Sequence, residues 1–579
     1  MKRKTIKKIA SLLALTLTAT AAFAGCGKKD QTTNDKQSSS AESSVQTPES
    51  DAEPTEEPAP EKAGKVKVMV YDRATIPASE GDLNNNRWTE WIRENCNNEE
   101  VEFVNVPKAE AAETMSLLFA SGEGPDVYAH YEDAMQFYQN GMMLEITDEM
   151  LDKMPNYKAL VERYPSIEKV TTIDGKRMMI GNVGDIAANH TMVFRQDWLD
   201  NLGLQVPTTA DELYDVLYAF TYNDPDGNGV NDTWGINLTA DGQRILSHMF
   251  GFGNPEKYTV DADGNVIYAW DNIEAWLGFC KKLVDNKLVN PDFLTMKGDD
   301  DQADFLNGRI GFWLQGRLTN SSKHVTYGNI KDSLPDATIA TCALPVTEFG
   351  QFTTYTSGGG GPRGFISSMT KDVDAALAYV DFLVTPEVTN YLSNGPEDVY
   401  YHANEYGTFT VVDPEKNAVE FDYASDYHII GGRNEESAMA NSTFNQFLSG
   451  SDESLYGLGD LIYQFNTIAN NKETYDPRKW LKDAKPALPE DLILISSTTD
   501  KIVDDILKAG MADSSKSAAD VVKEAKDAWT AAGGEAVDAF YAEYYKNNAD
   551  IAILPDSYND IKAEPVMTEA SKANSSLFN

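Results

Sequence analysis

The chain has 579 residues, of which 41% are hydrophobic and 24% are charged, so it is long enough to bury the cores of more than one domain. Its 91 Asp and Glu residues outnumber its 49 Lys and Arg residues, and the formal net charge is -42. This charge disfavours nucleic acids and anionic membrane surfaces as partners, and we attribute it to solubility.

The four cysteines are too few and too scattered for a disulfide scaffold. They are Cys26, Cys96, Cys280 and Cys342, and no Cys-x-x-Cys pair occurs among them. A zinc or redox site is therefore not expected, and the last three are predicted to be small buried side chains.

Residues 1–26 have the pattern of a secretory signal, with a basic start and an apolar stretch from Ile9 to Leu17. This apolar stretch is too short for a stable membrane span. The segment Phe23-Ala24-Gly25-Cys26 resembles a bacterial lipobox. It predicts cleavage before Cys26 and attachment of lipid, including palmitate, to that residue. The alternative is a plain secreted protein cleaved near Ala24.

Residues 27–63 are rich in Ser, Thr, Gln, Glu and Pro and contain almost no large apolar side chains. Such a segment cannot bury enough surface to offset the entropy of ordering it. We therefore expect a disordered tether.

Strands and helices alternate at the start of the folded part. An alternating strand at Lys65–Tyr71 is followed by an amphipathic helix with Trp88, Trp91 and Ile92, and by a strand from Val101 to Val106. A helix from Ala109 to Ala120 comes next. This order predicts a mainly parallel α/β sheet, in which ligands bind at the ends of the strands.

Two helices with clear end signals follow a strand that ends at Arg195. The first should stop at Gly203, because glycine readily adopts the left-handed conformation that ends helices. The second should start at Thr209, with Glu212 completing a capping box. Apolar residues recur at helical spacing after it.

The loop after this helix has the spacing of a calcium site. Oxygen ligands stand at positions 1, 3, 5, 7 and 9, where position 7 contributes a backbone carbonyl, and Gly229 permits the sharp turn at position 6. Position 12 is Gly235 rather than the glutamate of an EF-hand, so water or a remote side chain would have to complete the site. We expect a structural calcium ion, and an empty polar turn is the alternative. The predicted ligands are Asp224, Asp226, Asn228, Val230 and Asp232.

Two further segments repeat only part of a motif. Residues 261–265 repeat the start of the calcium pattern and are better read as a β-turn. The segment Gly359–Gly364 contains G-x-G-x-x-G, but its glycines precede a strand instead of opening a helix. We predict a hinge or cleft loop there, and not a dinucleotide site.

Taken together, these segments resemble extracellular solute-binding protein family 1 of ABC importers, and within it the large lipoproteins that bind sugars and oligosaccharides. Two departures stand out: Leu392–Tyr401 matches the family only partly, and Thr233 replaces an acid that members with this calcium loop tend to carry. The matching segments are Ser121–Tyr128, 172–195, 195–213, 224–235, Asn286–Phe293, Phe305–Phe312 and 343–384.

The resemblance implies a two-lobe α/β periplasmic-binding-protein fold with an interlobe hinge and a helix-rich C-terminal part. It assigns residues 64–185 and 345–393 to one lobe, and residues 186–344 and 394–579 to the other. It also implies a monomer, anchored through lipid alone at the extracellular face of the cell membrane. This monomer would capture a carbohydrate, with an oligosaccharide as the favoured class, and deliver it to the permease subunits of an ABC importer.

Candidate ligand-binding residues are aromatic and polar side chains at predicted strand ends or in glycine-bounded loops. Aromatic rings stack on the C–H faces of pyranoses, while carboxylates, amides and arginines bind the hydroxyl groups. The candidates are Tyr71, Asp72, Arg73, Trp88, Glu123, Tyr131, Glu132, Asn182, Asp185, Trp313, Gln315, Arg317, Tyr355 and Arg363.

Catalytic motifs are absent from the sequence: there is no G-x-S-x-G, H-E-x-x-H or Walker loop, and the six histidines have no metal-ligand spacing. We therefore expect no enzyme and no catalytic residue. Two alternatives stay open. A surface glycoside hydrolase or lyase needs only two suitably placed carboxylates, and a peptide-binding or sensory lipoprotein needs no sugar site.

Overall fold

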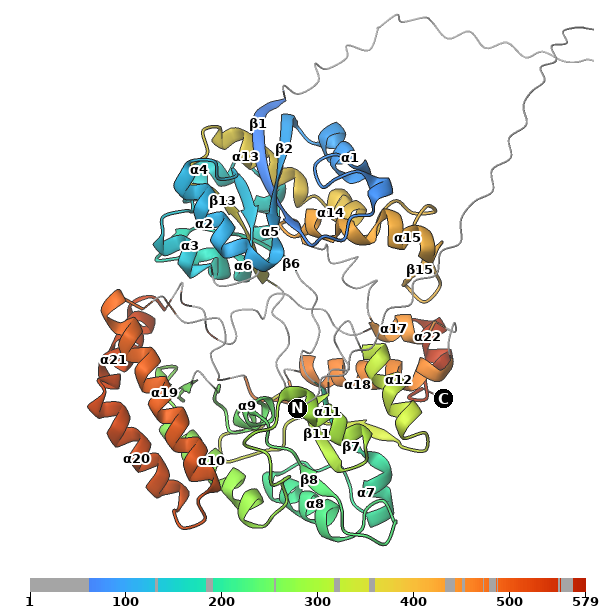
Figure 1. The fold of residues 1–579 in the computed structure, drawn as a ribbon, viewed down its shortest axis with the longest axis vertical. Coiled ribbons are helices and arrows are strands. Elements are labelled where there is room, and N and C mark those ends of the chain that lie inside the picture. The colour runs from blue at the N-terminus through green and yellow to red at the C-terminus, as the bar shows by residue number, and fades with distance from the viewer. Residues whose placement is uncertain are drawn as a thin grey trace, which may run out of the picture. The chain divides into compact units, whose positions relative to one another are not determined.

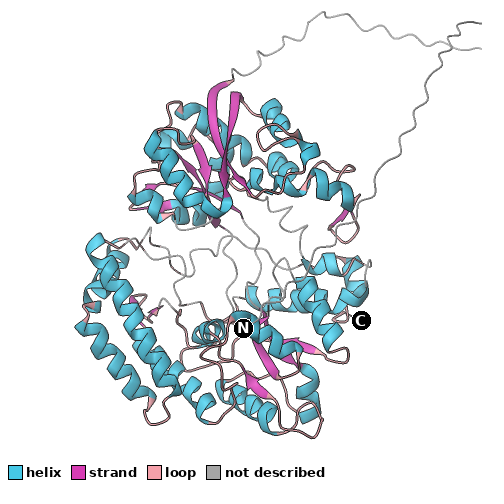
Figure 2. Ribbon diagram, viewed as in Figure 1, coloured by secondary structure: helices cyan, strands magenta, loops and turns pink. Residues whose placement is uncertain are grey.

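Two separate β-sheets, each with its own hydrophobic core, organise the folded part of the chain in the computed structural model (Figure 1). We call these two parts the first and the second lobe. In both of them the strands are covered by helices (Figure 2). The structure describes residues 62–130, 134–183, 191–254, 257–316, 323–353, 360–432, 443–449, 453–471, 473–477, 479, 486, 488–549, 552, 554 and 566–578. The predicted signal, Cys26 and nearly all of the tether lie outside these ranges.

The sheet of the first lobe has the strand order β2-β1-β3-β13-β6. Strand β1 runs parallel to β2 and β3, whereas β13 runs antiparallel to both β3 and β6. The carboxyl ends of β1, β2, β3 and β6 therefore lie at one edge of this sheet. Its strands are β1 (Ala63–Asp72), β2 (Asn98–Pro107), β3 (Val127–Ala129), β6 (Ile180–Val183) and β13 (Gly360–Ile366).

Helices of the first lobe come from two distant stretches of chain, and α1 lies on the opposite side of β1 and β2 from α2 to α4 in Figure 1. They are η1 (Ala78–Glu80), α1 (Arg87–Asn95), η2 (Lys108–Glu110), α2 (Ala111–Ser121), α3 (Met135–Gln139), α4 (Asp148–Leu151), α5 (Pro155–Arg163), α6 (Pro165–Thr171), α13 (Val373–Leu383), α14 (Pro386–Asn394), α15 (Pro414–Glu420) and η3 (Asp422–His428). Two small hairpins complete this lobe: β4 (Thr172–Ile173) with β5 (Lys176–Arg177), and β14 (Tyr401–Ala403) with β15 (Phe409–Val411).

The sheet of the second lobe has the strand order β12-β7-β11-β8, with β8 parallel to β11 and β7 antiparallel to its two neighbours. Its strands are β7 (Thr191–Arg195), β8 (Trp234–Ile236), β11 (Ile310–Gly316) and β12 (Ile339–Thr341), and β9 (Tyr258–Val260) and β10 (Val266–Tyr268) form a separate hairpin. Its helices are α7 (Gln196–Leu202), α8 (Ala210–Tyr222), α9 (Ala240–Met249), α10 (Trp270–Asp285), α11 (Gly298–Leu306), α12 (Lys323–Ser333), α17 (Thr443–Phe447), η4 (Glu453–Leu455), α18 (Tyr456–Asn470), α19 (Glu490–Ala512), α20 (Ala518–Ala531), α21 (Gly534–Asn547) and α22 (Glu569–Asn574).

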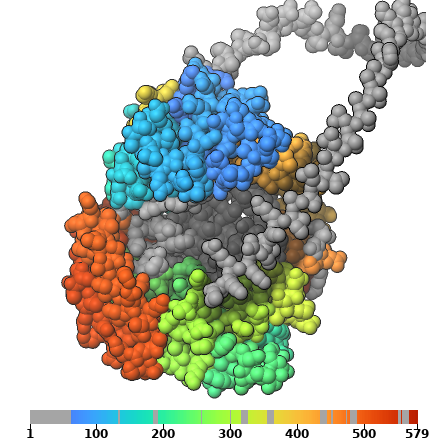
Figure 3. Space-filling model, viewed as in Figure 1, coloured from blue at the N-terminus to red at the C-terminus, as the bar shows by residue number. Residues whose placement is uncertain are grey.

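Both faces of the second sheet are buried, because successive residues of a strand point to opposite faces. Phe194 joins the larger core, where it stacks on Phe312 with 3.9 Å between the ring centroids, while Val193 joins a second core with Trp313. The helices α19 to α21 extend the larger core, and in Figure 3 their orange and red surface adjoins the green surface of this lobe.

Most predicted elements are confirmed by the structure. Strands β1 and β2 and helices α1 and α2 lie where the sequence pattern places them. Helix α7 ends at Gly203, whose φ of 67° is left-handed, and Thr209 and Glu212 form the predicted capping box of α8. Residues 261–265 form the turn between β9 and β10, and the three described cysteines are buried and unpaired.

Two local predictions are wrong. The glycine run at residues 360–364 is not a loop but part of strand β13. Glycine is required at Gly364, since a Cβ atom there would lie 2.9 Å from a side-chain carbon of Ile430. The resemblance to the solute-binding family also implies a hairpin at residues 305–312, but these residues form the end of α11 and the start of β11.

The packing of two segments differs from the lobe boundaries that the resemblance implies. Tyr400, Tyr423, Tyr427 and Ile430 belong to the core of the first lobe, although the boundary was expected after residue 393. Phe352 belongs to the core of the second lobe, beyond the boundary expected at residue 344. We assign each segment to the lobe whose hydrophobic core contains its large side chains, because these contacts define the core.

None of the helices in the described ranges is both long enough and apolar enough to cross a membrane.

We predict that Gly311→Ala destabilises the second lobe by about 1 to 3 kcal/mol, as overpacking of a buried site does. A Cβ atom at this position in β11 would lie 2.2 Å from Phe220 and 2.6 Å from Trp198, two fully buried rings. Urea unfolding followed by tryptophan fluorescence measures the effect. The control is Gly328→Ala in α12, where nothing lies within 4 Å and alanine should stabilise the helix. Equal stability of Gly311→Ala and the wild type would contradict the packing described here.

Candidate functional site

Polar and aromatic side chains gather at the carboxyl edge of the sheet in the first lobe. Tyr71 is the last residue but one of β1, and Lys108 and His130 directly follow β2 and β3. The Nζ atom of Lys108 lies 4.9 Å from the centroid of the Tyr71 ring, and the His130 ring lies 6.4 Å from it. Together with Arg73 and Asp426 we call these residues the strand-end cluster. Ligands of α/β proteins bind at such an edge.

The cluster is completed by an ion pair between residues 353 positions apart in the sequence. Arg73 donates two hydrogen bonds to the carboxylate of Asp426, from Nε at 2.5 Å and from Nη2 at 2.8 Å. The Asp426 side chain is 5% exposed, whereas that of Arg73 remains 38% exposed. The guanidinium is therefore held in a fixed orientation by a buried partner while part of it still faces solvent.

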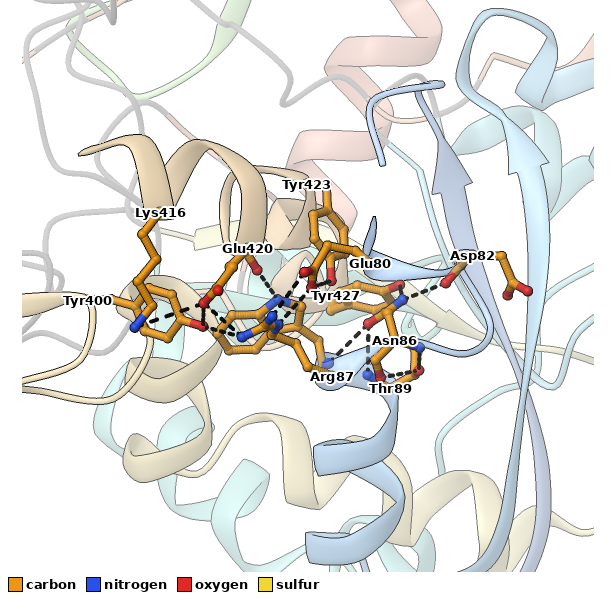
Figure 4. A network of polar contacts seen from close by, with 11 residues as sticks. Glu80, Asp82, Asn86, Arg87, Thr89, Tyr400, Lys416, Glu420, Tyr423 and Tyr427 are labelled. Carbon is orange, nitrogen blue, oxygen red and sulfur yellow. Dashed lines mark hydrogen bonds and ion pairs between the residues drawn. The ribbon is translucent and has the colours of Figure 1, made fainter. Parts of the chain in front are cut away.

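A network of polar contacts holds the segment that contributes Asp426 (Figure 4). Arg87 at the start of α1 donates two hydrogen bonds to Glu80, at 2.7 and 2.9 Å, and a third to Glu420, at 2.7 Å. The hydroxyl of Tyr423 donates to Glu80, and the Asn86 amide donates to Tyr427 beside Asp426. The hydrogen bonds from Arg87 hold the pKa of Glu80 below its usual value.

Beside this ion pair lies a small cavity of about 10 Å³, which is room for a water molecule and not for a sugar ring. It is lined by apolar side chains together with Tyr71, Asp426 and Tyr427. A larger ligand would therefore have to bind on the solvent side of Arg73.

Four of the predicted ligand residues lie at this edge. Besides Tyr71 and Arg73, Asp72 at the end of the same strand lies here and accepts a hydrogen bond from the Ala74 amide. Asn182 near the end of β6 is also at the edge, but it is buried and its amide donates to the carbonyls of Ile429 and Ile430. It thus braces the segment that carries Asp426.

Three other candidates are placed differently. Trp88 is 2% exposed and donates its Nε1–H to the carbonyl of Glu420, so it is part of the core. Trp313 is 2% exposed and packs against Phe305 in the second lobe. Glu123 precedes β3, at the edge opposite the strand-end cluster, where it lies 3.7 Å from Lys67.

The remaining candidates are described only partly or not at all. Gln315 and Arg363 belong to β11 and β13, but their side chains are outside the described part of the structure. Outside the described residues altogether lie Tyr131, Glu132, Asp185, Arg317 and Tyr355.

The sequence pattern misses three members of the strand-end cluster. Lys108 and His130 directly follow predicted strands, so the rule that selected Tyr71 could have selected them as well. Asp426 could not have been found in this way, because no local pattern links it to Arg73.

The predicted calcium loop has suitable ligand types but not the arrangement of a loaded site. Asp224 accepts a hydrogen bond from the Gly229 amide at 3.0 Å, and Asn228 donates to both Asp226 and Asp232. Burial and the neighbouring carboxylates raise the pKa of Asp226. Oδ1 of Asp224 is shielded and has no hydrogen-bond partner in the described structure. No group of three or more His, Cys, Asp or Glu side chains within the described ranges is gathered so that it could hold a metal ion.

Residues 85–390 match the sequence pattern of the family described as bacterial extracellular solute-binding protein, which is more than half of the chain. The chain belongs to this family. The match spans strands of both sheets. Members of the family bind solutes and are not enzymes, in agreement with the lack of catalytic motifs in the sequence.

Relatives of this solute-binding protein are known from sequence and from structure. The polygalacturonan/rhamnogalacturonan-binding protein YtcQ of Bacillus subtilis (strain 168) is 28% identical over 333 residues, which are 55% of this chain and 64% of YtcQ. The chain spans less than two thirds of the curated relatives that it matches.

Solved structures share the fold of this solute-binding protein over most of its length. An extracellular solute-binding protein from Bifidobacterium longum subsp. infantis has a TM-score of 0.63 at 18% identity, with 86% of this chain and 99% of that chain covered. An EF-hand mutant of the substrate-binding protein FusA from Streptococcus pneumoniae, in complex with fructo-nystose, has a TM-score of 0.53 at 18% identity, with 84% and 99% covered. At these identities the likeness establishes the periplasmic solute-binding fold alone.

We predict that Arg87→Gln in this solute-binding protein increases hydrogen exchange at residues 414–428. The substitution removes the cation between Glu80 and Glu420, and Glu80 would then be a nearly buried carboxylate without its ion-pair partner. Hydrogen exchange read by mass spectrometry measures the effect.

The control for this experiment is Arg177→Gln. Arg177 makes an equivalent double hydrogen bond to Glu168 in the same lobe, at 2.9 and 2.6 Å. This variant should lose stability without a selective change at residues 414–428. The same exchange pattern in both variants would show that the network does not hold this segment.

Proposed function

We propose that this solute-binding protein captures a carbohydrate outside the cell and delivers it to the permease subunits of an ABC importer. The observation that carries the proposal is the family match at residues 85–390, which spans strands of both sheets. The strand-end cluster supports it, because it places charged groups at the edge of an α/β sheet where ligands bind.

An oligosaccharide is the ligand class that we favour. The related YtcQ is named for binding pectic polysaccharides, and the FusA structure contains fructo-nystose. Asp72, Arg73, Lys108 and Asp426 are the kinds of group that bind sugar hydroxyls. Tyr71, Trp88 and Trp313 are nearly fully buried, so ring stacking would have to come from other aromatic residues such as Tyr131 and Tyr355. A hydrolase or a peptide binder is less well supported, since neither agrees with the family and its relatives.

We predict that one class of oligosaccharide raises the melting temperature of the Glu61–Asn579 unit and is recovered unchanged. A ligand at one hundred times its Kd stabilises a protein by about 2.7 kcal/mol, which a thermal shift detects readily. The panel contains oligogalacturonides, rhamnogalacturonan oligosaccharides and fructo-oligosaccharides. Cleavage of a sugar would indicate a hydrolase, and no shift with any glycan would contradict the proposed cargo.

Arg73→Ala should weaken binding of the active sugar about tenfold or more, because a hydrogen bond from a charged group contributes roughly 1.5 to 3 kcal/mol. Arg177→Ala serves as the control, since Arg177 is paired with Glu168 and does not belong to the strand-end cluster. Equal affinity of the two variants would exclude Arg73 from the binding site.

Membrane attachment forms the second part of the proposal. Cys26 would carry the lipid, and residues 27–63 would hold the folded lobes away from the membrane surface. A tether of this composition cannot fold by itself, so it leaves the lobes free to bind ligand.

A structural calcium ion forms the third part of the proposal. The FusA structure is named as an EF-hand mutant, which indicates a calcium-type loop in a protein of the same fold. Here Asp224, Asp226, Asn228, Asp232 and the Val230 carbonyl would supply hard oxygen ligands. The shielded Oδ1 of Asp224 and the mutual repulsion of the carboxylates support this assignment. A divalent cation would relieve that repulsion.

We predict that calcium raises the melting temperature of the protein and that a chelator reverses the effect. Asp226→Asn should abolish the calcium response. Asp261→Asn should retain it, because Asp261 starts a loop of similar sequence that closes as a simple turn through hydrogen bonds to Asn265. A calcium response that persists in Asp226→Asn would place the ion elsewhere, and no response in the wild type would refute the site.

A further inference from the structure

A buried carboxyl group in the second lobe has only one of its two oxygens in a hydrogen bond. Asp301 lies in the first part of α11 and is 2% exposed. Its Oδ2 atom accepts a hydrogen bond of 2.8 Å from the hydroxyl of Thr239. Its Oδ1 atom is shielded from solvent and has no partner among the described residues. An ionised carboxylate in such a place is strongly disfavoured, because water no longer solvates its charge.

The charged groups around Asp301 do not compensate for such a charge. Asp304 follows one helical turn later and accepts hydrogen bonds from the amides of Asn237 and Asn290, at 2.9 and 3.0 Å. Arg309 lies 3.6 Å from Asp304, and Arg244 on α9 pairs with Asp241 at 3.0 Å. The cations near the cluster are thus directed to other carboxylates, and no ion pair within the described structure involves Asp301.

On balance, the surroundings of Asp301 raise the pKa of its carboxyl group. The pKa of Asp301 is raised to about 7, mainly by burial and to a smaller extent by the charges of Asp241 and Asp304. The hydrogen bond from Thr239 and the neighbouring side chain of Asn237 lower this pKa in part. Asp304 differs from Asp301 in its partners, which are two amide donors and a nearby guanidinium.

We propose that Asp301 carries a proton in the folded protein at mildly acidic pH, and that its ionisation destabilises the packing of α11 against the turn that starts α9. Thr239 makes the connection: its hydroxyl donates to Asp301 and accepts from the Gly242 amide, so it also caps α9. When Asp301 ionises, the hydrogen bond from Thr239 becomes stronger, but the buried charge loses its solvation and repels Asp304 and Asp241, and this cost weakens the packing between the two elements.

The contact between Asp301 and Thr239 lies beside the sheet of the second lobe. Helix α9 follows β8, and both α9 and α11 pack against β11, the strand that carries Trp313 and Gln315. Protonation of Asp301 therefore stabilises the carboxyl edge of β8, whichever solute the protein binds. The inference does not depend on the proposed cargo.

The test compares the pH dependence of unfolding in the wild type and in Asp301→Asn. The folded pKa lies above that of the unfolded chain, so this stabilisation is complete below pH of about 4 and is lost as pH rises through about 7. Between pH 5 and 8 the unfolding equilibrium constant of the second lobe should rise roughly a hundredfold more in the wild type than in Asp301→Asn. Hydrogen exchange in α11, corrected for intrinsic rates, reads that constant.

The matched control is Asp381→Asn in the first lobe. Asp381 is a nearly buried carboxylate, but it accepts three hydrogen bonds, from the backbone amides of Asn156 and Tyr157 and from the Asn156 side chain. This variant should lose stability and keep the pH dependence of the second lobe. Retention of the full pH dependence in Asp301→Asn, or an equal loss of it in both variants, would overturn the proposal.

A second measurement uses the wild type alone and does not require the variant to fold. Part of the infrared C=O stretch of protonated carboxyl groups should titrate with a midpoint near pH 7, above the range in which exposed carboxyl groups titrate. Loss of the whole band below pH 6 would also overturn the proposal.

Discussion

The Arg73–Asp426 ion pair is the contact on which the candidate site depends. It joins the end of the first strand to a segment 353 residues later, and the network around Arg87 holds that segment in place. The edge of the first sheet is consequently built from segments that lie far apart in the chain. A ligand bound at this edge would contact residues that meet only after the late segment has packed into the first core.

The two lobes differ in the hydrogen-bond partners of their buried aspartate side chains. In the first lobe, Asp381 and Asp426 are surrounded by donors, so their charge is compensated by hydrogen bonds. In the second lobe, Asp304 receives the available amides and Asp301 does not. A proton is the simplest compensation for Asp301, and for this reason the second lobe is where pH should matter most.

Local sequence signals predicted much of the fold. The capping box of Thr209 and Glu212 and the stop at Gly203 depend on residues within one helical turn, so the sequence pattern located α7 and α8 correctly. The same reasoning from local sequence wrongly predicted a loop at the glycine run of β13. Gly364 avoids a clash with Ile430 and Ile180, and no pattern in the neighbouring sequence indicates that contact.

The candidate site was less predictable than the fold. Tyr71 and Arg73 were found because they end a recognisable strand, whereas Asp426 and Asp301 matter through partners distant in sequence. Trp88 and Trp313 were selected as aromatic residues, but composition cannot separate a ring that stacks on sugar from one that fills a core. Burial, which only the structure provides, decides between these roles.

The central claim is that a carbohydrate binds at the carboxyl edge of the first sheet. Hydrogen exchange of the protein with and without the oligosaccharide that stabilises it tests this most directly. We predict slower exchange at residues 71–74, 128–130 and 422–430 when the sugar is bound, and little change at residue 123 on the opposite edge. Protection confined to other segments, with these unchanged, would contradict the account.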